Sequence, residues 1–318
     1  MNVVDGLVRA FDSATSKQCT LSLVIDGAQS EGCNQQLDRW KTAYLSLFDG
    51  TPEESLIEIA PLLVPTSAMG PTDRLRLFSW AQDLAYRFPM VSWVESTLSA
   101  AQLADHLRSF HVVGLSEGQS MLLRWYDTRI LPIWLACLTG EQSQAFAAGS
   151  LQWDYVDRSG NVSTLLQATA AQPLPAAPAY GEPMIMLSDA QYGMLVDVAD
   201  LDVMLARLRR VIPDEIKQVP KSTLTRFVAR YQQEAVKAGL NDIDRQAQYI
   251  LLALYTSGKG IEQPEFKAFM KSPPASFNDF SNGIQALPEK VWNSGPPLWD
   301  ALPQSSVDVR PMPGRANA

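Results

Sequence analysis

Residues 120–138, "SMLLRWYDTRILPIWLACL", place two arginines and an aspartate inside the most apolar run of the chain. A transmembrane helix needs about 20 mainly apolar residues, and each charge near its centre costs about 2.5–3.5 kcal/mol on insertion scales. Arg124, Asp127 and Arg129 interrupt this run at close spacing, so the stretch does not fit a membrane span. It predicts instead a strand over 119–126 that gives way to a helix.

The charged residues of this run predict a braced corner between the strand and the helix. Asp127 suits the N-cap of a helix that begins after it, although Pro132 lacks the N–H that such a helix would use. A turn over 128–131 followed by a helix from Pro132 is the alternative, because proline is favoured in the first helical turn. In both versions Arg129 lies close to Asp127 and Arg124, and we expect salt bridges that fix the corner.

Composition indicates a folded chain that works in the cytoplasm. The 318 residues are 46% hydrophobic and 19% charged, as in globular proteins. The net charge of −8 argues against a nucleic-acid binder, because such proteins need a positive surface to displace counterions. Cys19, Cys33 and Cys137 are odd in number and widely spaced, unlike a secreted disulfide framework. The first residues lack the pattern of a secretory signal peptide.

Hydrophobic periodicity predicts an α+β protein with two lobes. Strands alternate with helices up to about residue 165, which indicates a mixed α/β N-terminal lobe over 1–167. The elements expected in this lobe are strands at Leu21–Ile25 and Tyr44–Phe48, and helices around 37–44, from Thr51, from Pro71 and from an N-cap at Ser99. The first strand ends at the turn-forming pair Asp26-Gly27.

The residues after 167 predict a linker, a helical lobe and a tail. The segment "ATAAQPLPAAPAYGEP", 168–183, is rich in Ala and Pro and fits an interlobe linker. In the helical lobe, 184–272, Ser188 and Gln191 form a capping box that starts the first helix. Three further helices are expected over Ser222–Ala238, Asp242–Tyr255 and Pro264–Met270. Residues 273–318 hold many prolines and no clear period, so we expect a tail that wraps the body or is partly disordered.

The pentapeptide "GLSEG", residues 114–118, matches the G-x-S-x-G nucleophile elbow of serine hydrolases. That fold requires its histidine after the serine, whereas the chain's two histidines, His106 and His111, both precede Ser116. Without a base the hydroxyl is a poor nucleophile, so we interpret the segment as a turn between strands at 110–113 and 119–126. A serine hydrolase using Ser116 stays open as the alternative function.

The sequence predicts no metal site and no cofactor. His106 and His111 are five residues apart, so on a helix they would diverge by roughly 140° and could not form the i, i+4 pair of a zinc helix. The sequence contains no P-loop, no G-x-G-x-x-G and no EF-hand spacing. We therefore expect a protein that is not an enzyme.

Seven short motifs follow one another over about residues 19–160. They are "VIDGAQ" (24–29), "LFDGTPEE" (47–54), "APLLVP" (60–65), "SWVES" (92–96), "LADHLRSF" (103–110), "LRWYDTRIL" (123–131) and "LQWDYVDRSG" (151–160). In this order they resemble the domain-of-unknown-function 4123 family, the adaptor-chaperones of bacterial type VI secretion. Residues 228–266 resemble the usual helical ending of the family. Thr128 stands where the family commonly has proline.

The resemblance implies an adaptor without catalytic activity. Family members bind the N-terminal region of a toxic effector in the bacterial cytoplasm and help load it onto the VgrG-like spike protein of the secretion apparatus. The acidic balance of the chain and the charges within 120–138 lead us to expect neither a nucleic-acid partner nor membrane insertion. An adaptor needs an apolar patch with aromatic and arginine anchors. The candidates, as partner-binding residues or as structural anchors, are Trp93, Arg124, Trp125, Tyr126, Asp127, Arg129 and Trp134. For each tryptophan, core packing is the alternative.

Overall fold

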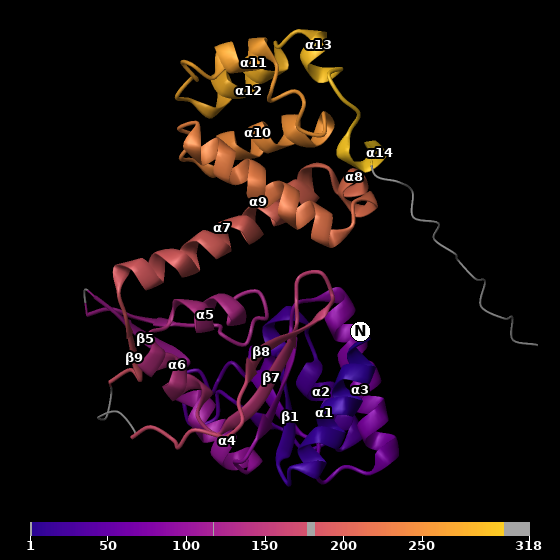
Figure 1. Cartoon of the computed structure of the whole chain (residues 1–318), viewed down its shortest axis with the longest axis vertical. Helices are drawn as coiled ribbons and strands as arrows, with labels where there is room; N and C mark the ends of the chain where they lie inside the picture. Colours follow the sequence, from indigo (N-terminus) through magenta and orange to yellow (C-terminus); the bar gives the residue numbers. More distant parts are fainter. Residues whose placement is uncertain (1, 117, 177–181, 302–318) are drawn as a thin grey trace, which may run out of the picture. The chain divides into compact units, whose positions relative to one another are not determined.

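The computed structural model describes residues 2–116, 118–176 and 182–301 (Figure 1). The chain divides into two compact units, Met1–Ala199 and Asp200–Ala318. The boundary falls inside one long helix, α7 (Asp189–Val211). The first unit contains both sheets and the second is helical over its described residues, so the predicted α+β class is confirmed.

A six-stranded antiparallel sheet forms the centre of the first unit. Its strands follow the order β2 (Leu45–Ser46), β3 (Pro61–Pro65), β1 (Thr20–Asp26), β4 (Val91–Ser96), β7 (Ser150–Val156) and β8 (Val162–Gln167). In the middle of the sheet, Leu23 pairs with Val64 on one neighbour and with Trp93 on the other. Every residue of β4 and all but the first of β1 are buried. Because side chains alternate between faces, both faces of the sheet are therefore covered.

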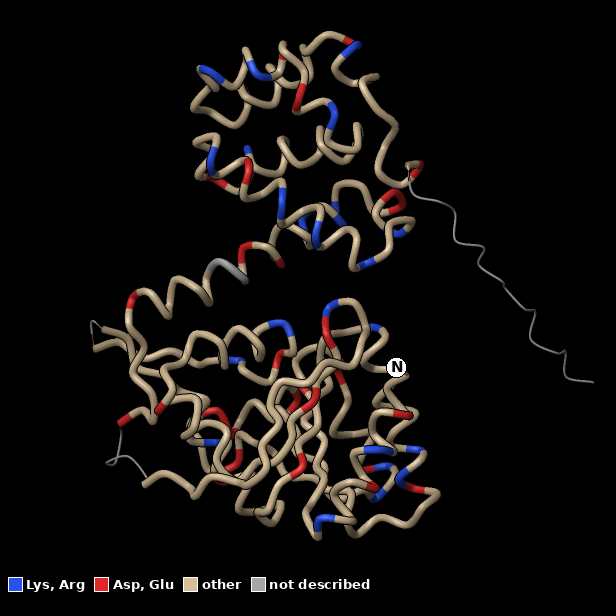
Figure 2. The backbone as a smooth tube through the Cα atoms, viewed as in Figure 1, with Lys and Arg blue, Asp and Glu red and all other residues tan. Residues whose placement is uncertain are grey.

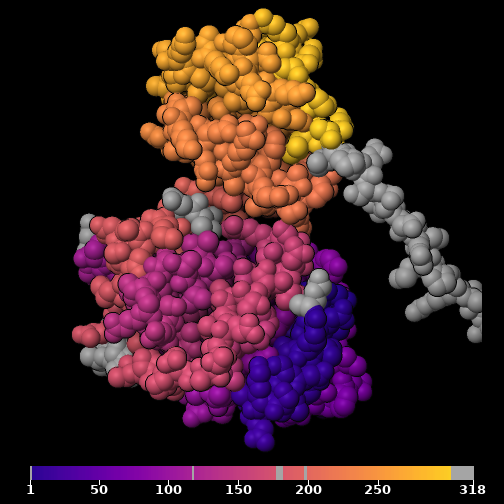
Figure 3. All heavy atoms as spheres, in the orientation of Figure 1, coloured from indigo at the N-terminus to yellow at the C-terminus, as the bar shows by residue number. Residues whose placement is uncertain are grey.

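Helices cover this sheet on both sides. They are α1 (Val3–Ser16), α2 (Cys33–Trp40), α3 (Pro71–Arg87), α4 (Ala100–Arg108), α5 (Leu131–Cys137) and α6 (Gly140–Ala147), with 3-10 turns η1 (Gly27–Gln29) and η2 (Ile57–Ile59). In Figure 1, α1, α2 and α3 gather on one side of the sheet, and α4, α5 and α6 on the other. Figure 3 shows the atoms of α1, in indigo, on the outside of the unit. Sequence patterns did not predict α1, which buries one face through Val3, Leu7, Ala10 and Ala14.

A smaller three-stranded sheet completes the first unit. Its order is β6 (Ser120–Leu122), β5 (Val112–Leu115) and β9 (Ile185–Leu187). β5 pairs with β6 antiparallel, which confirms the predicted hairpin turn around Ser116, and with β9 parallel. Gly114 permits the close approach of β9, because a Cβ at this position would lie 2.2 Å from the Met186 sulfur.

The corner at 120–138 differs in part from its prediction. The predicted strand over 119–126 is too long, since β6 ends at Leu122. The Asp127 N–H donates to the Arg124 carbonyl (3.1 Å), and this hydrogen bond closes a turn directly after the strand. α5 then begins at Leu131 with Pro132 in its first turn, so the predicted alternative, a turn followed by a proline-started helix, is confirmed.

The helix predicted from Thr51 is wrong. The Thr51 hydroxyl donates to the Phe48 carbonyl (2.8 Å), and its oxygen accepts from the Glu53 N–H (3.3 Å), which forms a turn. Turns continue to the short η2. The apolar residues of this segment, including Ile57, are exposed. A helix here would bury no apolar face, and tertiary packing supplies most helix stability in proteins.

The second unit is a helical cluster with its own hydrophobic core. Its elements after α7 are α8 (Pro213–Gln218), α9 (Lys221–Lys237), α10 (Ile243–Tyr255), α11 (Pro264–Phe269), α12 (Phe277–Gln285), α13 (Glu289–Trp292) and α14 (Leu298–Ala301). The three helices expected after the capping box are confirmed as α9, α10 and α11. The predicted tail, 273–318, is wrong up to residue 301, because Phe280, Ile284 and Val291 of α12 and α13 lie fully buried in this core. Residues 302–318 lie outside the described residues.

The boundary between the two units also differs from the predicted boundary between the lobes. The helical lobe was expected from residue 184, yet β9 pairs within the first unit, and Leu195 of α7 is buried in the first core. Part of the predicted linker, 168–183, is hydrogen-bonded to the first unit, since the Gly149 N–H donates to the Gln172 carbonyl (2.9 Å). Residues 177–181 lie outside the described residues. The Ser188–Gln191 capping box is present. Among the described helices, none has both the length and the apolar character that crossing a membrane requires.

Candidate functional site

Two of the sequence motifs meet at the end of β1 and form a charged cluster. Asp26 and Gln29 come from "VIDGAQ", and Arg124, Asp127 and Arg129 come from "LRWYDTRIL". The Arg124 guanidinium donates to Asp26 Oδ2 (2.8 Å), and Gln29 Nε2 donates to Asp127 Oδ2 (2.8 Å). Arg129 donates through Nε to Asp127 Oδ1 (2.9 Å) and through Nη2 to Oδ2 (2.6 Å). We call these five residues the brace.

The brace differs from the predicted corner in one pairing. Arg129 pairs with Asp127 as expected, but Arg124 reaches Asp26 of β1. The Asp26 and Asp127 carboxylates are buried, whereas the Arg124 and Arg129 side chains are 41% and 27% exposed. Burial raises the pKa of Asp26, the Arg124 charge opposes that rise, and the nearby Asp127 adds to it. Each buried carboxylate thus has an arginine that reaches it from the surface.

The brace holds the backbone that follows β1. Asp26 Oδ1 accepts from the Ala28 N–H (3.1 Å) and so caps η1. Gly27 is required here, because a Cβ at this position would lie 2.3 Å from the Ala60 carbonyl oxygen. Gln29, at the other end of η1, is tied to Asp127. The loop that continues from Gln29 is therefore fixed at its start by a charged, hydrogen-bonded network.

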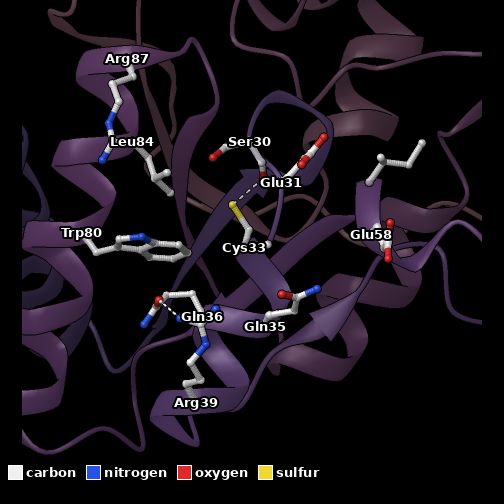
Figure 4. A pocket seen from close by; sticks show the side chains of 12 residues that line it. Ser30, Glu31, Cys33, Gln35, Gln36, Arg39, Glu58, Trp80, Leu84 and Arg87 are labelled. Atoms are coloured by element: carbon white, nitrogen blue, oxygen red, sulfur yellow. Dashed lines mark hydrogen bonds between the residues drawn. The ribbon is translucent and has the colours of Figure 1, made fainter.

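This loop forms one wall of a pocket of about 510 Å³ (Figure 4). The pocket is lined by the loop at 30–32, by α2, by the C-terminal half of α3 and by η2. Cys33 lies in its floor, only 3% exposed, and its thiol contacts the Ser30 carbonyl (3.2 Å). Burial raises the pKa of Cys33 to about 11, so this thiol stays protonated at neutral pH and is a weak nucleophile.

The pocket combines apolar walls with charges of both signs. Trp80 and Leu84 line it from α3 and Ile59 from η2. Trp80 packs edge-on against Trp40, with ring centroids 5.4 Å apart. The charged lining residues are Arg39, Arg87, Glu31 and Glu58. In Figure 2, basic and acidic positions are intermixed around α1, α2 and α3.

Exposed apolar side chains continue from this pocket along one segment. Leu56, Ile57 and Ile59 are 45%, 50% and 44% exposed, and Ile59 lines the pocket itself. Single exposed apolar residues are ordinary, whereas a contiguous group beside a cavity is typical of a binding surface. Sequence analysis missed this site. The apolar residues of "ESLIEI" (54–59) fall in the segment for which a helix from Thr51 was predicted, and that helix does not form.

The aromatic residues predicted as anchors lie in the core of the first unit. Trp93, Trp125, Trp134 and Tyr126 are each at most 1% exposed. Trp125 stacks on the ring of His111 at 5.7 Å and meets Trp153 edge-on at 5.9 Å. Their large apolar areas stabilise the unit, and the structure places none of the four at the surface. Of the predicted set, only Arg124 and Arg129 reach solvent to a large extent.

The residues of the hydrolase alternative do not come together. The Ser116 hydroxyl donates to Asp189 Oδ1 (2.5 Å). The Nε2 atoms of His106 and His111 lie against the carbonyl oxygens of Phe146 (3.1 Å) and Leu47 (2.8 Å) in the core. Within the described part of the chain, no group of three or more His, Cys, Asp or Glu side chains could hold a metal ion.

Comparison with known proteins identifies one part of the chain. Residues 21–145 match the model of a family described as "Domain of unknown function (DUF4123)". The match covers about two fifths of the sequence and contains the whole brace and every residue that lines the pocket. It confirms the resemblance for this region. No curated protein matches the chain, and no solved structure does.

Proposed function

Because residues 21–145 are a domain of the DUF4123 family, we propose that the protein is a non-catalytic adaptor-chaperone of bacterial type VI secretion. In this role it binds the N-terminal region of a toxic effector in the cytoplasm and helps load it onto a VgrG-like spike protein. The role is the one implied by the resemblance of the motifs. It needs a surface that recognises protein and requires no reaction.

One observation carries this proposal. The pocket and the exposed Leu56, Ile57 and Ile59 lie together within the matched region. Protein-recognition surfaces typically join an apolar centre with a polar rim, and Trp80 with Arg87 supplies both kinds of group at one wall. The brace supports this reading, because a recognition loop that is already ordered loses less conformational entropy on binding.

The placement of the aromatic residues is compatible with the same role. Trp125 and Tyr126 form the core beside the brace. The motif "LRWYDTRIL" thus contributes structure through its aromatic residues and positioning through its charged ones. In an adaptor, these residues would act by holding the docking surface in shape.

Co-expression with the toxin that the proposed role places in a neighbouring gene tests the proposal. The tagged full-length protein should co-purify with the toxin, and deletion of its gene should leave the toxin poorly soluble or poorly secreted. A toxin lacking its N-terminal region serves as the control and should not be captured. If the toxin is equally soluble and equally secreted without this protein, the adaptor role is wrong.

A further inference from the structure

The charged residues of the pocket have no partners of opposite charge within the described parts of the chain. Arg39 Nη1 donates to Gln36 Oε1 (3.3 Å), and Arg87 Nε donates to the Asp83 carbonyl (3.2 Å), so neither uses its charge in a salt bridge. Glu31 and Glu58 are exposed, and no described cation lies within salt-bridge distance of either. Each of these groups is available to a ligand.

The two signs of charge lie on different sides of the pocket. Figure 4 shows Arg87 with Trp80 on the side formed by α3, and Glu58 on the opposite side, with α2 between them. Cys33 and Leu84, both 3% exposed, provide an apolar floor. A ligand that fills the pocket therefore meets apolar surface in the middle, a cation on one side and an anion on the other.

This arrangement restricts the chemistry of the occupant. Two glutamates in the lining disfavour a phosphate or a nucleic acid, because anions would face like charges. A cation without an acidic group would meet Arg87 and Arg39 in the same way. A peptide that carries an apolar side chain between an acidic and a basic one satisfies all three surfaces. Exposed Leu56 and Ile57 extend the apolar contact beyond the pocket.

We propose that the pocket docks a peptide segment of the effector, with an apolar side chain inserted between Trp80 and Ile59, an acidic side chain beside Arg87 and a basic side chain beside Glu58. The assignment rests on the proposed adaptor function and names the part of the effector that is recognised. Specificity comes from the charge pairs, since, for a segment docked in the same chain direction, the opposite order of charges meets like charges at both ends.

Charge reversal tests the assignment on the full-length protein. Arg87→Glu and Glu58→Arg should each weaken binding of the full-length neighbouring toxin by about tenfold or more, because each change replaces an attraction by a repulsion. Arg9→Glu is the matched control, because Arg9 is also exposed on a helix of the first unit and also donates through Nε to a carbonyl four residues earlier (3.3 Å). It should stay within twofold of wild type.

A photoreactive amino acid in place of the exposed pocket residue Gln35 identifies the docked segment by mass spectrometry. The captured peptide should contain an acidic, an apolar and a basic residue close together, and exchanging its acidic and basic residues should restore binding to the Arg87→Glu/Glu58→Arg double variant. If both single variants bind within twofold of wild type, the pocket assignment is overturned while the adaptor function stands. If native mass spectrometry instead finds a small molecule that Arg87→Glu releases without loss of toxin, the assignment also fails. If the wild-type protein binds no toxin, both the pocket assignment and the adaptor function are refuted.

Discussion

We predict that Asp127→Asn lowers the free energy of unfolding of the first unit, because it breaks the hydrogen bonds of the brace. Asp127 is 2% exposed and accepts from Gln29 and from two nitrogens of Arg129. An asparagine of the same shape must turn an NH₂ group toward one of these donors, and it leaves the Arg129 guanidinium without its counter-charge. Breaking a fully buried ion pair costs about 3–5 kcal/mol. Because Arg129 is 27% exposed and can be rehydrated, we expect a loss of about 2–4 kcal/mol.

Urea unfolding followed by tryptophan fluorescence measures this loss, since the buried Trp93, Trp125 and Trp134 all report on the first unit. The midpoint should fall by on the order of 1 M urea. Asp105→Asn is the matched control, because Asp105 pairs with Arg108 in the same unit but its side chain is 74% exposed; its effect should stay below about 0.5 kcal/mol. If Asp127→Asn changes stability no more than this control does, the brace does not stabilise the corner.

Three further changes test other parts of the structure. Gly27→Ala should destabilise the first unit by about 1–3 kcal/mol through overpacking, because its Cβ would lie 2.3 Å from the Ala60 carbonyl oxygen; urea unfolding measures the loss. Burial lowers the pKa of His111 to about 4, so the unfolded state binds a proton that the folded state does not, and stability should fall as pH drops below about 6.5. Between pH 7.5 and 5, the free energy of unfolding of His111→Gln should fall by roughly 2 kcal/mol less than that of the wild type. Urea unfolding at both pH values measures the difference. A fluorophosphonate probe should leave the wild-type protein unlabelled, since Ser116 has no histidine beside it.

For each of these three predictions, one result would contradict the reasoning behind it. Gly140→Ala is the control for the first, because a Cβ there has nothing within 4 Å; equal effects of the two substitutions would contradict the close approach at η1. An unchanged pH dependence in His111→Gln would show that this imidazole titrates normally in the folded protein. Labelling that disappears in Ser116→Ala would revive the hydrolase alternative.

Sequence reasoning succeeded where local patterns and tertiary packing agree. The strand at Leu21–Ile25, the N-cap at Ser99 and the capping box at Ser188 follow local rules of side-chain alternation and hydrogen bonding. The brace was located in part, because Asp127 and Arg129 are close in sequence. Its other contact joins Asp26 to Arg124 across 98 residues, and no local pattern encodes the order of strands that brings them together.

The pocket could not be predicted for a related reason. Its walls come from α2, α3, η2 and the loop after β1, and their arrangement depends on tertiary packing. Ile57 and Ile59 follow the residues that predicted a helix from Thr51, and in the turns that form instead they are exposed. The α12 helix was missed for the opposite reason: flanking prolines suggested a tail, while Phe280 and Ile284 supply a buried stripe four residues apart.

The parallel pairing of β9 with β5 determines when the first unit can finish folding during synthesis. Val113 and Ile185 are partners in this ladder, so the edge of β5 stays open on a nascent chain until residues well beyond 145 have left the ribosome. A fragment cut at residue 145 would also lack β7 and β8 of the six-stranded sheet. An open edge invites pairing with another chain. The smallest fragment that holds every strand of both sheets therefore extends to the start of α7. The limits of the family match are a poor guide to where this polypeptide can be divided.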